Sequence, residues 1–95
     1  MPALLRLLTI VACCTAITAC TGKTFQRSHC AQELGIAWDE LSIAEADGFA
    51  GTVSYTKAFG LLTAAKTMQT VENFERCYQQ ARDARFYIQE SRKGQ

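Results

Sequence analysis

Apolar residues recur at intervals of three and four positions through most of this 95-residue chain. After residue 20, no stretch combines strict alternation with the β-branched enrichment that a strand requires. Steps of three and four return to the same side of a helix, so each such series marks one buried helix face. The sequence therefore predicts an all-α fold, either a small three-helix bundle or a helical hairpin.

Polar residues and glycine divide the periodic region into three predicted helices. The first follows Ser28 and ends before Asp47-Gly48, because glycine adopts the left-handed conformation without steric cost. The second begins near Thr52 or Ser54, both good N-cap residues, and the third begins after Thr70. The predicted inward faces are Cys30, Leu34, Ala37, Leu41 and Ala44; then Tyr55, Ala58, Phe59, Leu61, Leu62, Ala65 and Met68; and last Phe74, Cys77, Tyr78, Ala81, Ala84 and Ile88.

The first nineteen residues have the composition of an export signal. Arg6 precedes an apolar run, Leu7 to Ala19, that contains no charged residue. This run is shorter than the roughly 20 residues that a membrane-spanning helix needs. Its length is typical of the apolar region in a secretory signal peptide. We therefore interpret residues 1–19 as a signal peptide that is cleaved on export.

The end of this segment reads Ile17-Thr18-Ala19-Cys20 and resembles the bacterial lipobox. In that motif, small residues precede a cysteine that receives a diacylglyceryl group and becomes the mature N-terminus. The resemblance thus implies lipidation of Cys20. Ile10-Val11-Ala12-Cys13 also fits the short pattern, but cleavage there would leave an apolar region of only about six residues. The alternative is a cysteine that happens to end an ordinary signal peptide.

The lipobox resemblance also implies a location. Thr21, rather than aspartate, follows Cys20, which in lipoproteins of enteric type implies sorting to the outer membrane. Several acyl chains anchor a protein stably without a spanning helix. We therefore expect a protein of the bacterial cell envelope that is lipid-anchored to the outer membrane and faces the periplasm. Residues 20–28 would form a polar tether and residues 29–95 the helical periplasmic domain.

Cleavage and lipidation would leave two of the five cysteines as thiols, Cys30 and Cys77. An even pair in an oxidising compartment favours a disulfide over two free buried thiols. The bridge would close a loop of about 48 residues, for which chain entropy predicts roughly 4 kcal/mol of stabilisation. No Cys-x-x-Cys pair is present in the mature chain, and one neighbouring histidine does not complete a zinc site.

Large and small residues are interspersed along the last two predicted helices at Leu61, Ala64, Ala65 and Met68, followed by Phe74, Cys77, Ala81 and Ala84. This pattern resembles a degenerate tetratricopeptide-type helical hairpin, in which such residues let two antiparallel helices interlock. The first-helix aromatic, turn glycine and closing proline of that family are missing. The resemblance implies protein or peptide binding and carries over no catalytic residue. A generic antiparallel hairpin is the alternative.

Arg85 falls within the apolar stripe of the third predicted helix. A buried arginine needs an ionic partner. The first helix offers four acidic residues for such an ion pair: Asp39, Glu40, Glu45 and Asp47. The favoured interpretation is instead that the methylenes of Arg85 pack against the core while its charged group stays in water.

Four apolar residues lie off the main inward stripes, Ile36 and Ile43 on the first helix and Phe86 and Tyr87 on the third. Together they are candidates for a protein-binding surface. The alternative is that they are single exposed apolar residues, which are ordinary in soluble proteins.

The composition offers little for catalysis or nucleic-acid binding. Ten basic and nine acidic residues give no positive excess to hold a polyphosphate. The only histidine, His29, lies at the tether end of the first predicted helix, and no acid-base site can be assembled around it. Asp39, Glu40 and Asp83 are interpreted as solvated charges. We predict no enzymatic activity, no cofactor, no metal site and no nucleic-acid partner.

These patterns predict a non-enzymatic adaptor or accessory subunit of an envelope complex, bound to the membrane by its lipid and to an envelope protein by its helices. The alternative is a structural or stress-related lipoprotein that associates with itself and has no dedicated partner. The self-associating form would bury Ile36, Ile43 and Tyr87 between copies.

Overall fold

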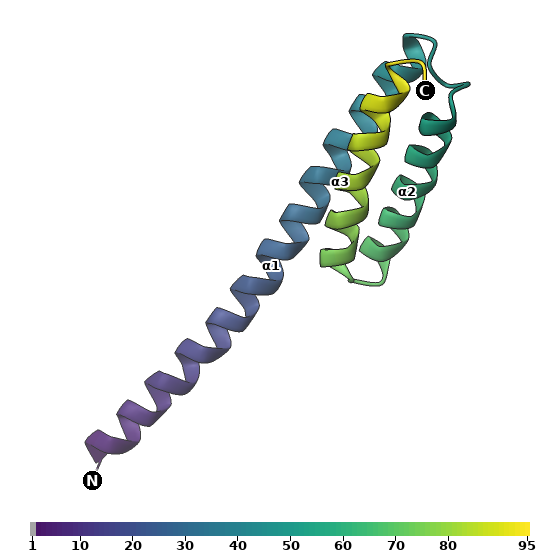
Figure 1. Cartoon of the computed structure of the whole chain (residues 1–95). Coiled ribbons are helices and arrows are strands. Elements are labelled where there is room, and N and C mark those ends of the chain that lie inside the picture. The colour runs from purple at the N-terminus through teal and green to yellow at the C-terminus, as the bar shows by residue number, and fades with distance from the viewer. Residues whose placement is uncertain (1) are drawn as a thin grey trace.

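A computed structural model describes the backbone of residues 2–95 and the side chains of residues 24–95. It contains three helices, α1 (Pro2–Ala46), α2 (Val53–Thr70) and α3 (Phe74–Ser91). Figure 1 shows that α2 runs back along α1 and that α3 returns beside both, while the N-terminal part of α1 extends beyond the two shorter helices. The predicted all-α three-helix fold is confirmed over the part of the chain that the structure describes.

The first helix starts earlier than the sequence predicts. Residues 24–28, which belong to the predicted tether, have helical backbone. The Arg27 guanidinium donates to Glu72 Oε1 at 3.3 Å and lies 5.3 Å from the centre of the Phe74 ring, so this turn is held against the start of α3. The helix start after Ser28 is therefore wrong. The tether of residues 20–28 and cleavage after residue 19 stay predictions.

Side-chain caps and one glycine define the turns between the helices. Thr52 Oγ1 accepts a hydrogen bond from the backbone N–H three residues on, at 3.2 Å, and caps α2, so it is the N-cap among the two predicted candidates. Asn73 Oδ1 caps α3 in the same way at 3.3 Å. Because Glu72 takes a left-handed φ of 62° in the preceding turn, α3 begins later than the predicted start after Thr70. Gly48 has a φ of 92°, the conformation that favours glycine.

The core is made of a few large side chains and six alanines. Its residues are Cys30, Leu34, Ala37, Leu41, Ala44, Ala58, Leu62, Ala65, Phe74, Cys77, Ala81, Ala84 and Ile88. All of them belong to the inward faces predicted from the spacing. Phe59 was also predicted to face inward, but it is 50% exposed, and its ring lies edge-to-face with Trp38 at a centroid distance of 6.0 Å. Alanines at the helix contacts let the backbones approach closely, which makes the bundle narrow.

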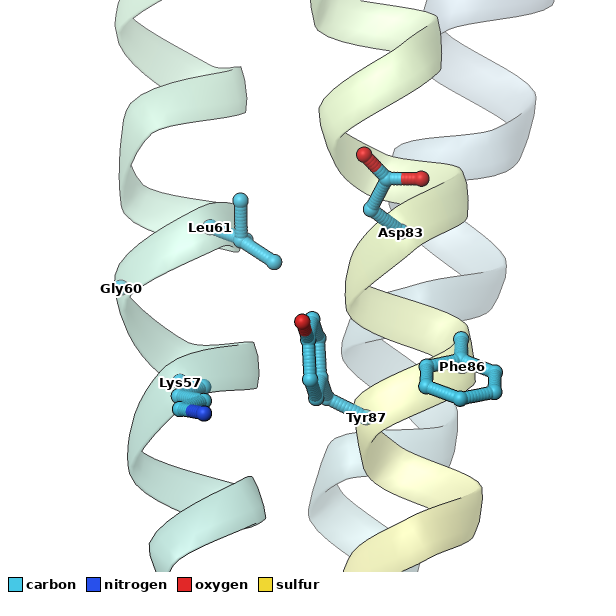
Figure 2. Close-up of a pocket in the computed structure, with 6 residues that line it drawn as sticks. All are labelled: Lys57, Gly60, Leu61, Asp83, Phe86 and Tyr87. Carbon is cyan, nitrogen blue, oxygen red and sulfur yellow. The ribbon is translucent and has the colours of Figure 1, made fainter.

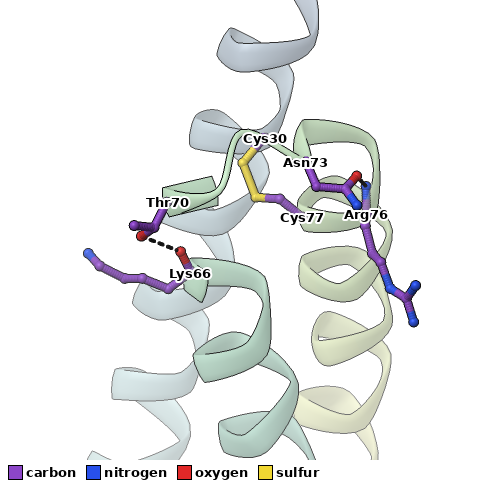
Figure 3. The surroundings of a disulfide bond; sticks show 6 residues. All are labelled: Cys30, Lys66, Thr70, Asn73, Arg76 and Cys77. Atoms are coloured by element: carbon purple, nitrogen blue, oxygen red, sulfur yellow. Dashed lines mark hydrogen bonds between the residues drawn. A yellow bond between two sulfur atoms is a disulfide. The ribbon is translucent and has the colours of Figure 1, made fainter. Parts of the chain in front are cut away.

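A disulfide joins Cys30 of α1 to Cys77 of α3 near the turn between α2 and α3 (Figure 3). The two Cα atoms are 5.5 Å apart, within the usual range for bridged cysteines, and both side chains are fully buried. This is the pair that the cysteine count predicts. The covalent loop encloses all of α2, so the bridge fixes the first and third helices together around the second.

Candidate functional site

An open groove follows the outer side of the seam between α2 and α3. One part, about 620 Å³ in volume, is lined by Lys57, Gly60, Leu61, Asp83, Phe86 and Tyr87 (Figure 2). A second part, about 460 Å³, lies toward the α2–α3 turn and is lined by Leu61, Asn73, Glu75, Arg76, Gln79, Gln80 and Asp83. Because the two parts share Leu61 and Asp83, we treat them as one α2/α3 groove.

Helical spacing explains why polar residues of α3 line this groove. Arg76, Gln80, Asp83 and Tyr87 are separated by four, three and four positions and therefore form one stripe on α3. The Lys57 ammonium of α2 lies 5.5 Å from the centre of the Tyr87 ring of α3, so these two side chains meet across the seam. Figure 2 shows Leu61 and Tyr87 pointing into the space between α2 and α3, with Asp83 above Tyr87.

Two side chains of the groove lining, Asp83 and Gln80, have acceptors without a donor from the described part of the protein. The Asp83 carboxylate forms no ion pair or side-chain hydrogen bond with any residue whose side chain the structure describes. Gln80 Oε1 is buried and likewise accepts no hydrogen bond. Asp83 is exposed, so water solvates its carboxylate. Gln80 Oε1 is shielded from solvent and is an exception among buried polar atoms, which are almost always paired.

The opposite side of α3 carries an ion-pair cluster that connects it to α1. Arg85 Nε and Nη2 donate to Glu40 Oε1 at 3.1 and 2.9 Å, and Arg85 Nη1 donates to Glu33 Oε1 at 2.8 Å. These hydrogen bonds, first to Glu40 and then to Glu33, raise the pKa of the Arg85 guanidinium. The favoured prediction of a solvated Arg85 is therefore wrong, and the ion-pair alternative holds with Glu40. Glu33 was not among the predicted partners, yet it lies seven residues before Glu40 and reaches the same guanidinium.

Replacing Arg85 with methionine should lower the free energy of unfolding by about 1–2 kcal/mol, because two carboxylates would face each other without a cation. The loss stays modest because the Arg85 side chain is 34% exposed, and water screens the remaining charges. Arg82→Met, an exposed cation on the same helix, is the matched control and should change stability by less than about 0.5 kcal/mol. Urea unfolding followed by circular dichroism measures both.

The triple variant Arg85→Met, Glu33→Gln, Glu40→Gln should recover part of the lost stability, since it removes the unpaired charges as well. Equal losses for the Arg82 and Arg85 variants, or no recovery in the triple variant, would contradict the ionic role of this cluster.

The four apolar candidate residues are divided between two places. Phe86 and Tyr87 line the α2/α3 groove, and Phe86 is 57% exposed. Ile36 and Ile43 lie on α1, outside the groove lining, and are 37% and 50% exposed.

Cys20 lies outside the residues whose side chains the structure describes, so its lipidation stays a prediction. Asp83 is exposed, as its interpretation as a solvated charge expects. Sequence reasoning missed Gln80 and the groove, although the stripe of polar residues on α3 was a signal for it.

Among residues with described side chains, no group of three histidine, cysteine or acidic residues is arranged to hold a metal ion. No helix within the described part of the chain has the length and apolar character needed to cross a membrane. Comparison with protein-family models, with curated proteins and with solved structures finds no match. The functional proposal therefore starts from the groove itself.

Proposed function

We propose that this protein is a lipid-anchored, non-enzymatic adaptor of the bacterial envelope that binds a partner protein through the α2/α3 groove. The observation that carries the proposal is the composition of the groove: two aromatic rings, Phe86 and Tyr87, lie beside Leu61 and the exposed Asp83 carboxylate. Aromatic residues are enriched at protein interfaces. The disulfide between α1 and α3 supports a rigid binding surface.

The apolar run and the lipobox-like Ile17-Thr18-Ala19-Cys20 support the membrane location. Lipidation of Cys20 would place the anchor on α1, ten residues before Cys30. The groove, which lies between α2 and α3, then remains available to a partner in the periplasm.

Self-association is the competing function, favoured by the exposure of Ile36 and Ile43 on α1. Sedimentation of the purified full chain in detergent separates the two functions. A stable homo-oligomer that dissociates when both isoleucines are replaced by serine would support the self-associating form.

Photo-cross-linking in intact envelopes tests the adaptor function. A photo-reactive phenylalanine analogue in place of Phe86 should give one discrete adduct with a second protein. The same analogue in place of Thr63, which is exposed on α2 and does not line the groove, should not. Adducts of this chain only with itself would favour self-association, and the lack of any adduct at position 86 would contradict the adaptor proposal.

A further inference from the structure

We infer that the end of the bundle at the α2–α3 turn rests on the membrane surface, so that the three helices stand upright on a phospholipid bilayer. This inference rests on the proposed lipid anchor at Cys20 and adds an orientation to it. It follows from three observations: the short link between Cys20 and the bundle, the exposed apolar residues at this end, and the distribution of charge along α1.

The link between the anchor and the bundle is short. Arg27 contacts Glu72 and Phe74, so the turn of α1 around it is held at the α2–α3 turn. Only four positions separate Cys20 from Thr24, where this part of α1 begins. In the helical backbone of the structure these positions span about 6 Å. Even a fully extended chain would span at most about 14 Å, so the α2–α3 turn cannot lie far from an acylated Cys20.

The anchor and the α2–α3 turn lie toward the same end of the bundle. Figure 1 shows the N-terminal part of α1 leaving the bundle past this turn, while the C-terminus and the α1–α2 turn lie at the opposite end. The anchor end carries two exposed apolar side chains, Phe25 on α1 and Val71 in the turn, which are 66% and 63% exposed. Apolar side chains held this close to a bilayer are stabilised by contact with its interfacial region.

The charges along α1 favour an upright orientation over a flat one. Residues 20–28 contain Lys23 and Arg27 and no acidic residue. Residues 29–47 contain five acidic residues and no lysine or arginine, and the two arginines of α3 that pair with them neutralise only part of this charge. Anionic phospholipids attract the basic segment and repel the acidic one. A bundle standing on its anchor end keeps the acidic segment away from the lipid and leaves the α2/α3 groove open to the periplasm.

Tryptophan fluorescence in vesicles tests this orientation. The chain has one tryptophan, so Trp38→Phe gives a background without any. Val71→Trp and Val53→Trp then place single probes at the two ends of α2, at valines that are both exposed. The 18 residues of α2 separate these probes by about 27 Å. The acylated full chain is reconstituted into vesicles of phosphatidylethanolamine and phosphatidylglycerol in equal amounts, in which some headgroups carry a nitroxide quencher.

Quenching should be several-fold stronger at position 71 than at position 53, which is the matched control. Ile43→Trp, at an exposed position in the acidic part of α1, should be quenched as weakly as the probe at position 53. Circular dichroism checks that each variant is folded. Equal quenching at positions 71 and 43 would mean that the bundle lies flat, and a lack of quenching at position 71 would mean that it is held away from the bilayer. Either result would overturn the inference.

Mass spectrometry of the mature N-terminus separates failure of this inference from failure of the proposed function. If the chain is acylated and position 71 is not quenched, only the upright orientation is wrong, and the lipid-anchored adaptor stands. If the N-terminus carries no acyl chain, the lipid anchor is wrong and the orientation fails with it.

Discussion

Replacing Cys77 with serine is expected to lower the free energy of unfolding by about 4 kcal/mol. The disulfide joins residues that are 47 positions apart, so its loss releases a long loop in the unfolded chain. Cys77 is also fully buried, and a serine there would place a hydroxyl among apolar neighbours. A domain of this size gains only about 3–5 kcal/mol from its core, so we expect the variant to be largely unfolded at 37 °C.

Circular dichroism during urea titration of the full chain in detergent micelles, with and without a reductant, measures this loss. The matched control is the double variant Cys30→Ser, Cys77→Ser, which should be as unstable as the single variant and insensitive to reductant. Reduction of the wild type should reproduce the same shift. An unchanged unfolding midpoint after complete reduction would contradict the prediction and would mean that packing alone holds α1 and α3 together.

The buried face of each helix could be predicted because it depends on local spacing. Ala37, Ala58 and Ala81 lie in the core because each shares a helix side with larger apolar residues a few positions away. The break at Gly48 is equally local, since it depends on the conformational freedom of a single residue. Such features need no knowledge of how the helices pack.

The features that depend on contacts between helices were predicted less well. Residues 24–28 are helical beside Glu72 and Phe74, which lie more than forty positions later in the chain. The partners of Arg85 depend on the distance between α1 and α3, which brings Glu33 within 2.8 Å of its guanidinium. Phe59 was placed inward because its spacing fits the stripe, but alanine contacts fill the inner face and leave its ring half exposed.

The lining of the candidate groove also depends on contacts between helices, which the sequence alone does not give. The sequence shows the stripe of Gln80, Asp83 and Tyr87. Whether these residues form contacts within the chain depends on which side chains of α2 lie opposite them. Lys57 contacts the Tyr87 ring rather than the Asp83 carboxylate, so the aspartate keeps an unpaired charge. A different register between α2 and α3 would pair these two charges within the chain.

Replacing Leu62 with alanine is expected to lower the free energy of unfolding by about 3 kcal/mol. Leu62 is fully buried and is one of the few large side chains in a core that is otherwise rich in alanine. Alanine neighbours cannot extend into the space that the leucine leaves, so most of the cavity would remain. The loss of unfolding free energy should therefore exceed the smallest losses found for leucine-to-alanine substitutions in protein cores.

Leu61→Ala is the matched control, because it makes the same chemical change one position away at a partly exposed site in the groove. It should cost less than about 1 kcal/mol, since the leucine is already partly in water. Urea denaturation of both variants in the oxidised state measures the difference. If the two losses were equal, α2 would have to be rotated about its axis relative to the arrangement described, and Leu61 would be a core residue. The lining of the α2/α3 groove would then change with it, so this pair of variants tests the packing on which the proposed binding surface depends.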